Sequence, residues 1–108
     1  MKIVEDDFLL RIFIGEDQKH HGKLLYETII GKARELEMAG ATVIRGIMGF
    51  GADKRIHTSK ILDLTENLPV IVEIIDTEEK INQIIPFLDE VIEKGFMTME
   101  KVHVFKYR

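Results

Sequence analysis

The chain has 108 residues, 45% of them apolar and 31% charged, which is the length and composition of one domain with a packed core. Its 15 Lys and Arg residues against 19 Asp and Glu residues leave a net charge of −4, and this argues against a nucleic-acid binder, which needs a basic face. The absence of cysteine excludes disulfides, thiolate metal sites and cysteine nucleophiles.

The sequence also lacks the patterns of membrane proteins and exported proteins. No apolar run approaches the roughly 20 residues that a spanning helix needs. Residues 1–7 are acidic, whereas a signal peptide begins with a basic segment and continues with an apolar one. We therefore expect a single domain over residues 1–108, located in the cytoplasm, with no direct membrane insertion.

The first half of the chain predicts one strand and one helix. Residues 8–14 are rich in β-branched and aromatic side chains and predict the first strand. After a polar loop over 15–22, apolar residues recur at helical spacing through 25–38, with Gly40 as the stop. Gly31 lies inside this helix at a cost of about 1 kcal/mol relative to alanine, which predicts a close packing partner there.

Three further strands are predicted over 42–48, 69–75 and 102–107. The second of them starts with a proline, where a missing N–H costs least. Residues 51–68 show no clear period, and a loop of that length in a compact domain is usually functional or disordered.

A second helix is predicted between the last two strands. Residues 76–79 resemble a capping box, and the apolar residues over 81–92 form a single stripe. Pro86 predicts a kink and Gly95 the end of the helix. The order βαββαβ is that of the ferredoxin-like α+β fold, with a four-stranded antiparallel sheet and both helices on one face.

The second face of that sheet is predicted to be apolar as well. The strands 8–14 and 69–75 carry apolar residues on both parities, interrupted by Arg11 and Glu73, whose charges suit each other. Exposing each such side chain would cost about 1.5–3 kcal/mol, and a patch of this size marks an interface. The sequence therefore predicts an oligomer built on the uncovered face; the alternative is ordinary strand composition.

Glycines and basic residues open the long irregular stretch at 49–57. Spaced glycines let backbone N–H groups approach a ligand, and the lysine, arginine and histidine add cationic donors, which suits an anion such as phosphate. The alternative is a bulge and turn followed by a solvated run of charges. The candidate residues are Gly49, Phe50, Gly51, Ala52, Lys54, Arg55 and His57.

These residues carry a family resemblance. Gly49-Phe50-Gly51 followed by Lys54 and His57 resembles the start of the T-loop in PII signalling proteins. Residues 68–75 resemble the strand that closes that loop, and 101–105 the strand after the PII phosphate-binding loop. Residues 39–51 and 55–58 are more specifically similar to the PII-like family catalogued as domain of unknown function 190.

The resemblance implies a trimer of ferredoxin-like subunits. Small anionic effectors, typically the adenine nucleotides AMP, ADP or ATP, would bind in clefts between the subunits, and no cofactor would be required. The long loop at about 51–68 would then contact a partner protein. The resemblance places Gly49, Phe50 and Gly51 beside the ligand, Glu73 and Ile75 at the base pocket, and Lys101 at the phosphates.

Two departures from the PII pattern concern the phosphates. PII proteins have Gly-Asp-Gly before the lysine, whereas residues 98–100 here are Thr-Met-Glu. The tail that supplies arginines from the neighbouring subunit is missing apart from Arg108. A nucleotide with fewer phosphates, or another anion, therefore stays open as the effector.

Two other function classes fit parts of the sequence. The loop at 16–21 holds two carboxylates and two imidazoles, which is the motivation for a metal-responsive trimer resembling divalent-cation tolerance proteins, although the spacing matches no closed metal motif. A ligand-free protein-interaction module is the other alternative. No nucleophile with an orienting acid and no nucleotide-hydrolase fingerprint is present, so an enzyme is not expected.

Overall fold

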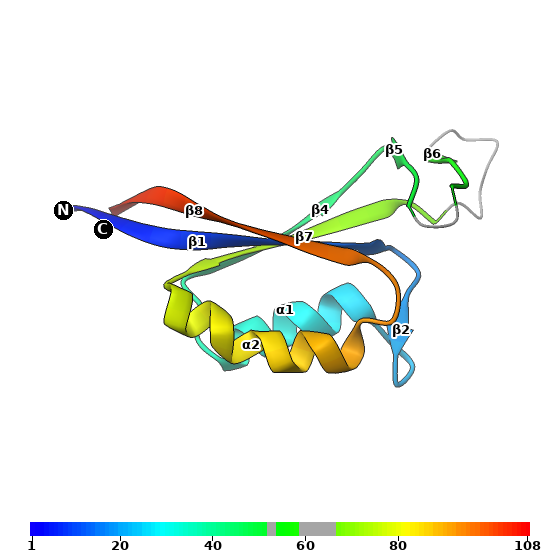
Figure 1. Cartoon of the computed structure of the whole chain (residues 1–108), viewed down its shortest axis with the longest axis horizontal. Helices are drawn as coiled ribbons and strands as arrows, with labels where there is room; N and C mark the ends of the chain where they lie inside the picture. Colours follow the sequence, from blue (N-terminus) through cyan, green and yellow to red (C-terminus); the bar gives the residue numbers. More distant parts are fainter. Residues whose placement is uncertain (52–53, 59–66) are drawn as a thin grey trace.

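The computed structural model describes residues 1–51, 54–58 and 67–108. Its principal elements are β1 (Lys2–Gly15), α1 (Leu25–Glu35), β4 (Gly40–Arg45), β7 (Pro69–Asp76), α2 (Glu78–Val91) and β8 (Phe96–Tyr107). Four short strands complete the set, namely β2 (Lys19–His20), β3 (Lys23–Leu24), β5 (Met48–Gly49) and β6 (His57–Thr58). The four long strands form one antiparallel sheet in the order β4-β7-β1-β8, and the predicted ferredoxin-like fold is confirmed (Figure 1).

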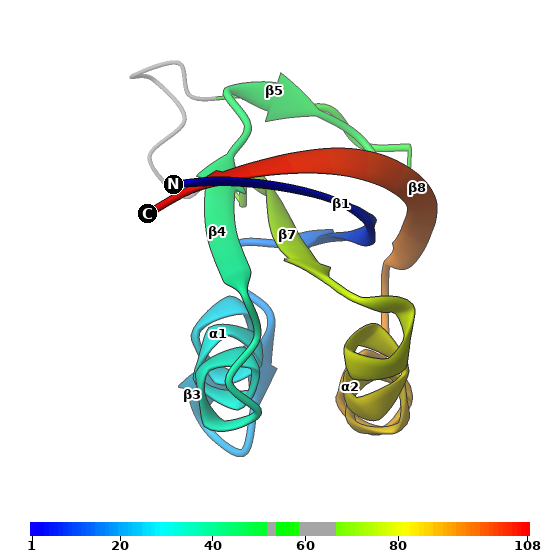
Figure 2. The same ribbon diagram turned by 90° about the vertical axis from the view of Figure 1, so that its left-hand side faces the viewer.

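Both helices cover the same face of the sheet (Figure 2). The core between the two layers takes Leu10, Ile12 and Ile14 from β1, and Ile12 is fully buried opposite Val72. Ile29 of α1 and the apolar stripe of α2 close this core from below. Alternation along the strands therefore sends every second residue of β1 and β7 to the helices and the others to the opposite face.

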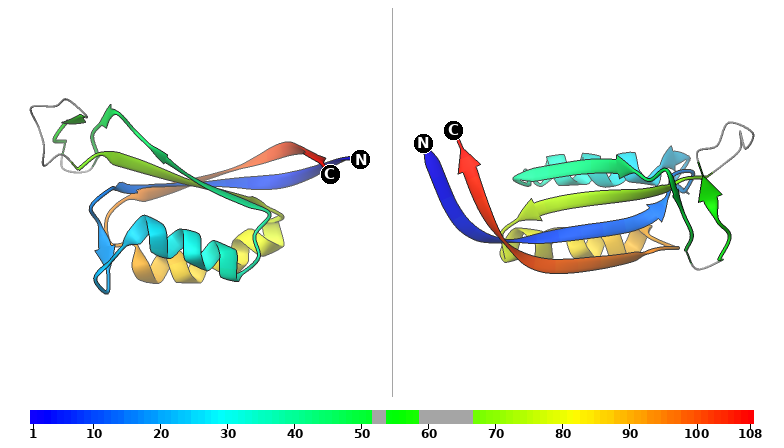
Figure 3. Two further views of the ribbon diagram at one scale, coloured as in Figure 1. Left: turned by 180° about the vertical axis from the view of Figure 1, so that it is seen from behind. Right: turned by 90° about the horizontal axis from the view of Figure 1, so that it is seen from above.

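β1 and β8 are both longer than predicted and continue past the ends of β4 and β7 (Figure 3). Residues 2–7 pair only with 102–107, and we call these two segments the arm. The expected starts at residues 8 and 102 were therefore wrong by six residues each. The residues that were not predicted as strand are 2–7, which include three acidic side chains, and 96–101. Each of these segments becomes a strand by pairing with a distant one, 102–107 and 8–13 respectively.

α1 ends at Glu35, three residues before the predicted end at Met38. Glu37 has a φ of 57°, and the Met38 N–H donates to the carbonyl of Ala33, so the chain closes the helix with a turn before β4. The packing partner predicted for Gly31 is also wrong. Gly31 is exposed, and a Cβ there would meet nothing within 4 Å.

α2 begins as predicted, because the Thr77 hydroxyl accepts a hydrogen bond from the Lys80 N–H at 3.2 Å. The helix continues through Pro86 to Val91, so Gly95 does not end it. Gly95 instead allows the close turn between α2 and β8. Its φ is +139°, and a Cβ on it would lie 2.3 Å from the carbonyl oxygen of Phe13, so only glycine fits this turn into β8. Among the described residues, no helix is long and apolar enough to cross a membrane.

The strand predicted over 42–48 is divided in two. β4 ends at Arg45; Gly46 still donates its N–H to the Pro69 carbonyl at 2.7 Å, and the chain bends at Ile47. β5 then pairs with β6 rather than with the main sheet. The loop predicted over 51–68 thus contains β6, while its residues 52–53 and 59–66 lie outside the described part of the chain.

The uncovered face of the sheet is apolar, as the sequence predicted. Its apolar members include Leu9, Phe13, Ile44, Ile71, Ile75 and Phe96. The predicted charge pair lies among them, with Arg11 Nε 2.9 Å from Glu73 Oε2, and Glu100 Oε1 accepts from Arg11 Nη1 at 2.5 Å. These carboxylates raise the pKa of Arg11 through their hydrogen bonds, Glu73 first. We call this surface the open face.

Candidate functional site

An open pocket of about 410 Å³ lies at the end of the sheet opposite the arm. Four segments form it: the end of β1 with the residues after it, the base of the long loop, the start of β7, and the turn from α2 into β8. Figure 1 shows this end of the molecule on the side of β5 and β6. Segments far apart in the sequence therefore meet here, and we call this hollow the loop-base pocket.

Close backbone contacts hold the loop base against β7. A Cβ on Gly46 would lie 2.8 Å from Pro69 Cγ, and one on Gly49 would lie 3.1 Å from the same atom. Both glycines thus let the strand leaving β4 pass directly over the proline ring. This contact with Pro69 is a packing role, and the predicted approach of a ligand to the backbone of these glycines stays a prediction.

Asn67 joins the opposite wall to the end of β1. Its Oδ1 accepts from the Asp17 N–H at 2.9 Å, and the neighbouring Glu16 N–H donates to the Leu68 carbonyl at 2.8 Å. A Cβ on Gly15 would lie 2.7 Å from Asn67 Nδ2, so the amide packs directly over the chain at that point. These contacts fix the pocket wall before any ligand enters.

Aromatic rings give the pocket its apolar surface. Phe13 and Phe96 stack with 4.6 Å between ring centroids and an angle of 12° between the rings. Phe50, on the loop base, is 62% exposed, and Lys54 Nζ lies 5.6 Å from the centroid of its ring. The pocket is thus a shallow aromatic hollow rather than a closed cavity.

A small number of polar groups line the same hollow. Lys94 brings an ammonium group, Asp17 a carboxylate, and His57 an imidazole, while Gln18 and Asn67 bring amides. A mostly apolar wall with a few convergent polar groups is the usual form of a small-molecule site. This arrangement accommodates a flat ring with one anionic group, and its described residues form no recognisable catalytic arrangement.

Four of the predicted site residues line the loop-base pocket, namely Gly49, Phe50, Gly51 and His57. Lys54 lies beside them through its contact with Phe50, and Arg55 is exposed on the same loop. Ala52 falls outside the described residues. The sequence thus located the loop side of this pocket.

The other predicted site residues lie elsewhere in the protomer. Glu73 and Ile75 are on the open face, and Glu73 is engaged by Arg11. Lys101 pairs in register with Phe8, at the opposite end of the β1–β7 ladder from the pocket, and its Nζ lies 3.7 Å from Asp6 Oδ2. Arg108 bonds through its backbone to Met1 at the tip of the arm. One protomer therefore does not bring these residues to the pocket.

Residues 98–100, which replace the glycines of the PII phosphate loop, lie within β8 and pair with β1. The turn that faces the pocket is instead formed by residues 92–95, between α2 and β8. Sequence reasoning did not select Lys94 on this turn, nor Phe96 at the start of β8 and its partner Phe13 on β1. The sequence signal that could have indicated this turn is the glycine at 95, between Lys94 and Phe96 and just before a strand.

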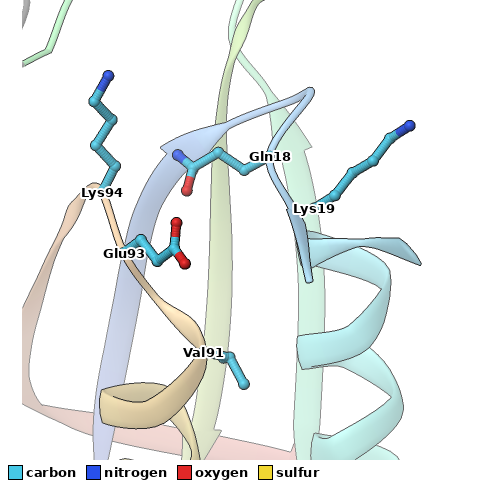
Figure 4. Close-up of a pocket in the computed structure, with 5 residues that line it drawn as sticks. All are labelled: Gln18, Lys19, Val91, Glu93 and Lys94. Carbon is cyan, nitrogen blue, oxygen red and sulfur yellow. The ribbon is translucent and has the colours of Figure 1, made fainter. Parts of the chain in front are cut away.

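A second hollow, of about 500 Å³, lies on the helix side between β2 and the end of α2. Figure 4 shows Lys19 and Lys94 pointing outward in different directions, with Glu93 between Lys94 and Val91. Its described lining residues include no aromatic side chain, and their charged groups do not converge. We therefore place the candidate site in the loop-base pocket despite its smaller volume.

The loop at 16–21 does not assemble a metal site in the described part of the chain, where no three His, Cys, Asp or Glu side chains gather as ligands. His20 and His21 pack edge to face with 4.1 Å between ring centroids. Glu16 bonds Arg45 at 3.0 Å. The carboxylate and the imidazoles thus have separate neighbours.

Comparison with solved structures places the fold among PII-like signalling proteins. CPII of Thiomonas intermedia K12, a nitrogen regulatory PII-like protein solved with ADP, AMP and bicarbonate, matches with a TM-score of 0.66 at 13% identity, over 94% of this chain and 91% of that one. A putative PII-like signaling protein of Thermus thermophilus matches with a TM-score of 0.61 at 17% identity, over 95% and 91%. The molecule has a PII-like fold.

The sequence comparisons identify the family within this fold. The DUF190 family model, described as "Uncharacterized ACR, COG1993", matches residues 8–104. A UPF0166 protein of Aquifex aeolicus is 44% identical over 96% of this chain and 97% of its own, and one of Methanocaldococcus jannaschii is 38% identical over 91% of each. The chain belongs to the DUF190 family, as the sequence predicted.

Proposed function

We propose that this protein is a trimeric cytoplasmic sensor that binds a small anionic effector, an adenine nucleotide such as AMP, ADP or ATP, between its subunits. The observation that carries the proposal is the loop-base pocket, where aromatic rings and Lys94 adjoin the base of the long loop on a PII-like fold. A ligand in this pocket contacts the loop directly, so binding can change how the loop at about 51–68 meets a partner protein.

The open face supports the assembly part of the proposal. Ile44 is 42% exposed and Phe96 57% exposed in a single protomer, and apolar neighbours surround them. Association would remove this surface from water at about 25 cal/mol per Å². It would also bring residues of a neighbouring subunit toward the pocket, which is how Lys101 or Arg108 would reach an effector.

We propose a binding role rather than an enzymatic one. The polar groups of the pocket are spread around an aromatic wall, and among the described residues near it no serine or cysteine nucleophile is paired with a base. The metal-responsive alternative gains no support from the described residues, for the reasons given above.

Titration calorimetry on the intact chain tests the ligand. We expect saturable heat with at least one of AMP, ADP and ATP, and the same nucleotide is expected to raise the melting temperature by mass action. Sedimentation at micromolar concentration is expected to show a trimer. Absence of heat from all three nucleotides at millimolar concentration would remove adenine nucleotides as effectors, and a stable single-chain particle would remove the trimer.

A further inference from the structure

Asp7 lies at the root of the arm, directly before the point where the ladder between β1 and β7 begins. β7 pairs with β1 from Phe8 onward, so in the described part of the chain residues 2–7 have β8 as their one strand neighbour. Figure 3 shows the two strands of the arm continuing together past the end of β7. The arm can therefore bend or separate while the ladder over the core stays intact.

The carboxylate of Asp7 is buried without a hydrogen bond. The residue is 1% exposed, and neither of its oxygens has a hydrogen-bond partner among the described residues. Asp76 is also buried, but its oxygens accept from the N–H groups of Ala39 at 2.9 Å and Thr77 at 2.7 Å. A buried carboxyl group without donors is far more costly when charged than when protonated.

A single ammonium group stands between Asp7 and a second carboxylate. Lys106 Nζ lies 2.5 Å from Glu5 Oε1 and 3.8 Å from Asp7 Oδ2, so its hydrogen bond goes to Glu5. Burial and the negative charge of Glu5 raise the pKa of Asp7, Lys106 of β8 offsets part of this rise, and Asp76 of β7 adds to it. The charged groups around Asp7 thus favour its neutral form.

We propose that protonation of Asp7 closes the arm and that its ionisation opens it. In the closed arm the neutral carboxyl group stays buried and Lys106 stays on Glu5. When Asp7 releases its proton to the solvent, the arm bends outward and water reaches the carboxylate. Because closure raises the pKa, closure is strongest below the unfolded-state pKa of Asp7 and weakens as the pH rises through its folded-state pKa.

The competing response to ionisation is a transfer of Lys106 from Glu5 to Asp7 while the arm stays closed. This transfer would leave Glu5 without its cation and keep two carboxylates and one ammonium group beside each other at a buried position. Opening instead hydrates Asp7 and separates only a two-stranded ladder at the ends of the chain, which is the kind of segment that opens at low free energy. The geometry therefore favours opening.

Backbone hydrogen exchange on the intact chain, followed by NMR at pH 4 and pH 8, measures this opening. The amides of 2–7 and 102–107 report on the arm, and those of 8–14 report on the part of β1 that also pairs with β7. Each variant is compared with the unmodified chain at the same pH, so that the pH dependence of the exchange chemistry cancels.

Two variants and one control separate the charge of Asp7 from other effects. Asp7→Asn keeps the shape of the side chain and removes its charge. Glu5→Gln removes the negative charge beside Asp7 and releases Lys106 to pair with it. Asp6→Asn is the control, because the Asp6 side chain is 49% exposed and alternates to the other face of the same strand.

We expect the arm of the unmodified chain to exchange faster than residues 8–14 at pH 8. The arm of Asp7→Asn is expected to exchange about ten-fold more slowly than the unmodified arm at pH 8, and within about two-fold of it at pH 4. Glu5→Gln is expected to slow the arm about three-fold at pH 8, and Asp6→Asn to remain within about two-fold at both pH values.

Three results would overturn the proposal. Equal exchange of the arm in Asp7→Asn and the unmodified chain at pH 8 would show that the charge of Asp7 does not control it. Exchange of the unmodified arm no faster than that of residues 8–14 would show that it opens only with the whole domain. Faster exchange of the arm in Glu5→Gln would show that the pair of Glu5 and Lys106 holds it closed. The proposal goes beyond the proposed function, and none of these results depends on whether the chain binds a nucleotide.

Discussion

At the scale of single residues, Asp7 is the most unusual group in the described part of the chain. It lies where the arm leaves the sheet and is 1% exposed, yet neither carboxylate oxygen has a hydrogen-bond partner there. Its closest cation, Lys106 Nζ, is 3.8 Å away and is held by Glu5 at 2.5 Å. Burial raises the pKa of Asp7, the negative charge of Glu5 raises it further, and the positive charge of Lys106 offsets only part of this rise.

This raised pKa predicts that Asp7→Asn stabilises the protein at neutral pH. Because the folded state favours the protonated carboxyl, Asp7 contributes stability below its unfolded-state pKa, and that contribution is lost as the pH rises through the folded-state pKa. An amide carries no charge to bury and avoids this loss. We expect a gain on the order of 1–2 kcal/mol in the free energy of unfolding at pH 8, measured by urea denaturation, that shrinks toward zero near pH 4.

Asp6→Asn is the matched control for this prediction. Asp6 is exposed and contacts Lys101 and His103, with 2.5 Å between Asp6 Oδ1 and His103 Nδ1. Its substitution removes surface ion pairs and is expected to change stability by less than about 1 kcal/mol, without a gain at pH 8. Equal stability of Asp7→Asn and the unmodified chain at pH 8 would contradict the interpretation of Asp7.

At the scale of elements, substituting two glycines by alanine is expected to change the free energy of unfolding in opposite directions. Gly95 has a positive φ and no room for a Cβ, so Gly95→Ala forces the turn away from β1 and is expected to cost on the order of 2–3 kcal/mol. Gly31 lies in α1, where a methyl group in place of its hydrogen would meet nothing within 4 Å, so Gly31→Ala is expected to stabilise by about 0.5–1 kcal/mol. Urea unfolding of the two variants measures both values; a gain with Gly95→Ala would contradict the account of the turn.

Periodicity predicted the helices and the order of the strands because these depend on short-range patterns. The stripe of α2 and the cap at Thr77 are examples, since each is determined within a few residues. Residues 2–7 and 96–101 were missed because they become strands by pairing with residues at the other end of the chain, 102–107 and 8–13. Phe13 and Phe96 were missed as site residues for the same reason, because only the β1–β8 register brings them together.

The loop side of the candidate site was more accessible to sequence reasoning. Gly49 and Phe50 lie in a local run of glycines and basic residues, which is visible without any tertiary information. Lys94 and Asn67 belong to the pocket only because α2 and β7 bring their flanking segments to one end of the sheet. Local pattern therefore located the loop, and topology supplied the opposite wall.

At the scale of the whole molecule, the open face bears on whether one protomer can form the complete binding site. The protomer measures 48 × 27 × 21 Å, and the helices cover one side of its sheet. The pocket lies at one end and the arm at the other. A binding site that also includes Lys101 or Arg108 requires a neighbour to place its arm near the pocket.

A charge on the open face is therefore expected to prevent association. Ile44→Glu places a carboxylate among apolar neighbours on β4, at a position that is already 42% exposed, so a single protomer tolerates it. We expect sedimentation to show smaller particles at micromolar concentration. Gln83→Glu adds the same charge at an exposed position of α2 and is expected to leave the assembly unchanged. Unaltered sedimentation of Ile44→Glu would contradict the assignment of this interface.

The arm brings the first and last residues together, because the Arg108 N–H donates to the Met1 carbonyl at 2.9 Å and the Met1 ammonium donates to the Arg108 carbonyl at 2.5 Å. Both ends thus leave the molecule at one point, far from β5 and β6 (Figure 1). A fluorescent reporter fused to either end would occupy the same position, at the opposite end of the protomer from the loop-base pocket. A short peptide bridge between the two ends would convert the backbone into a ring without displacing any strand.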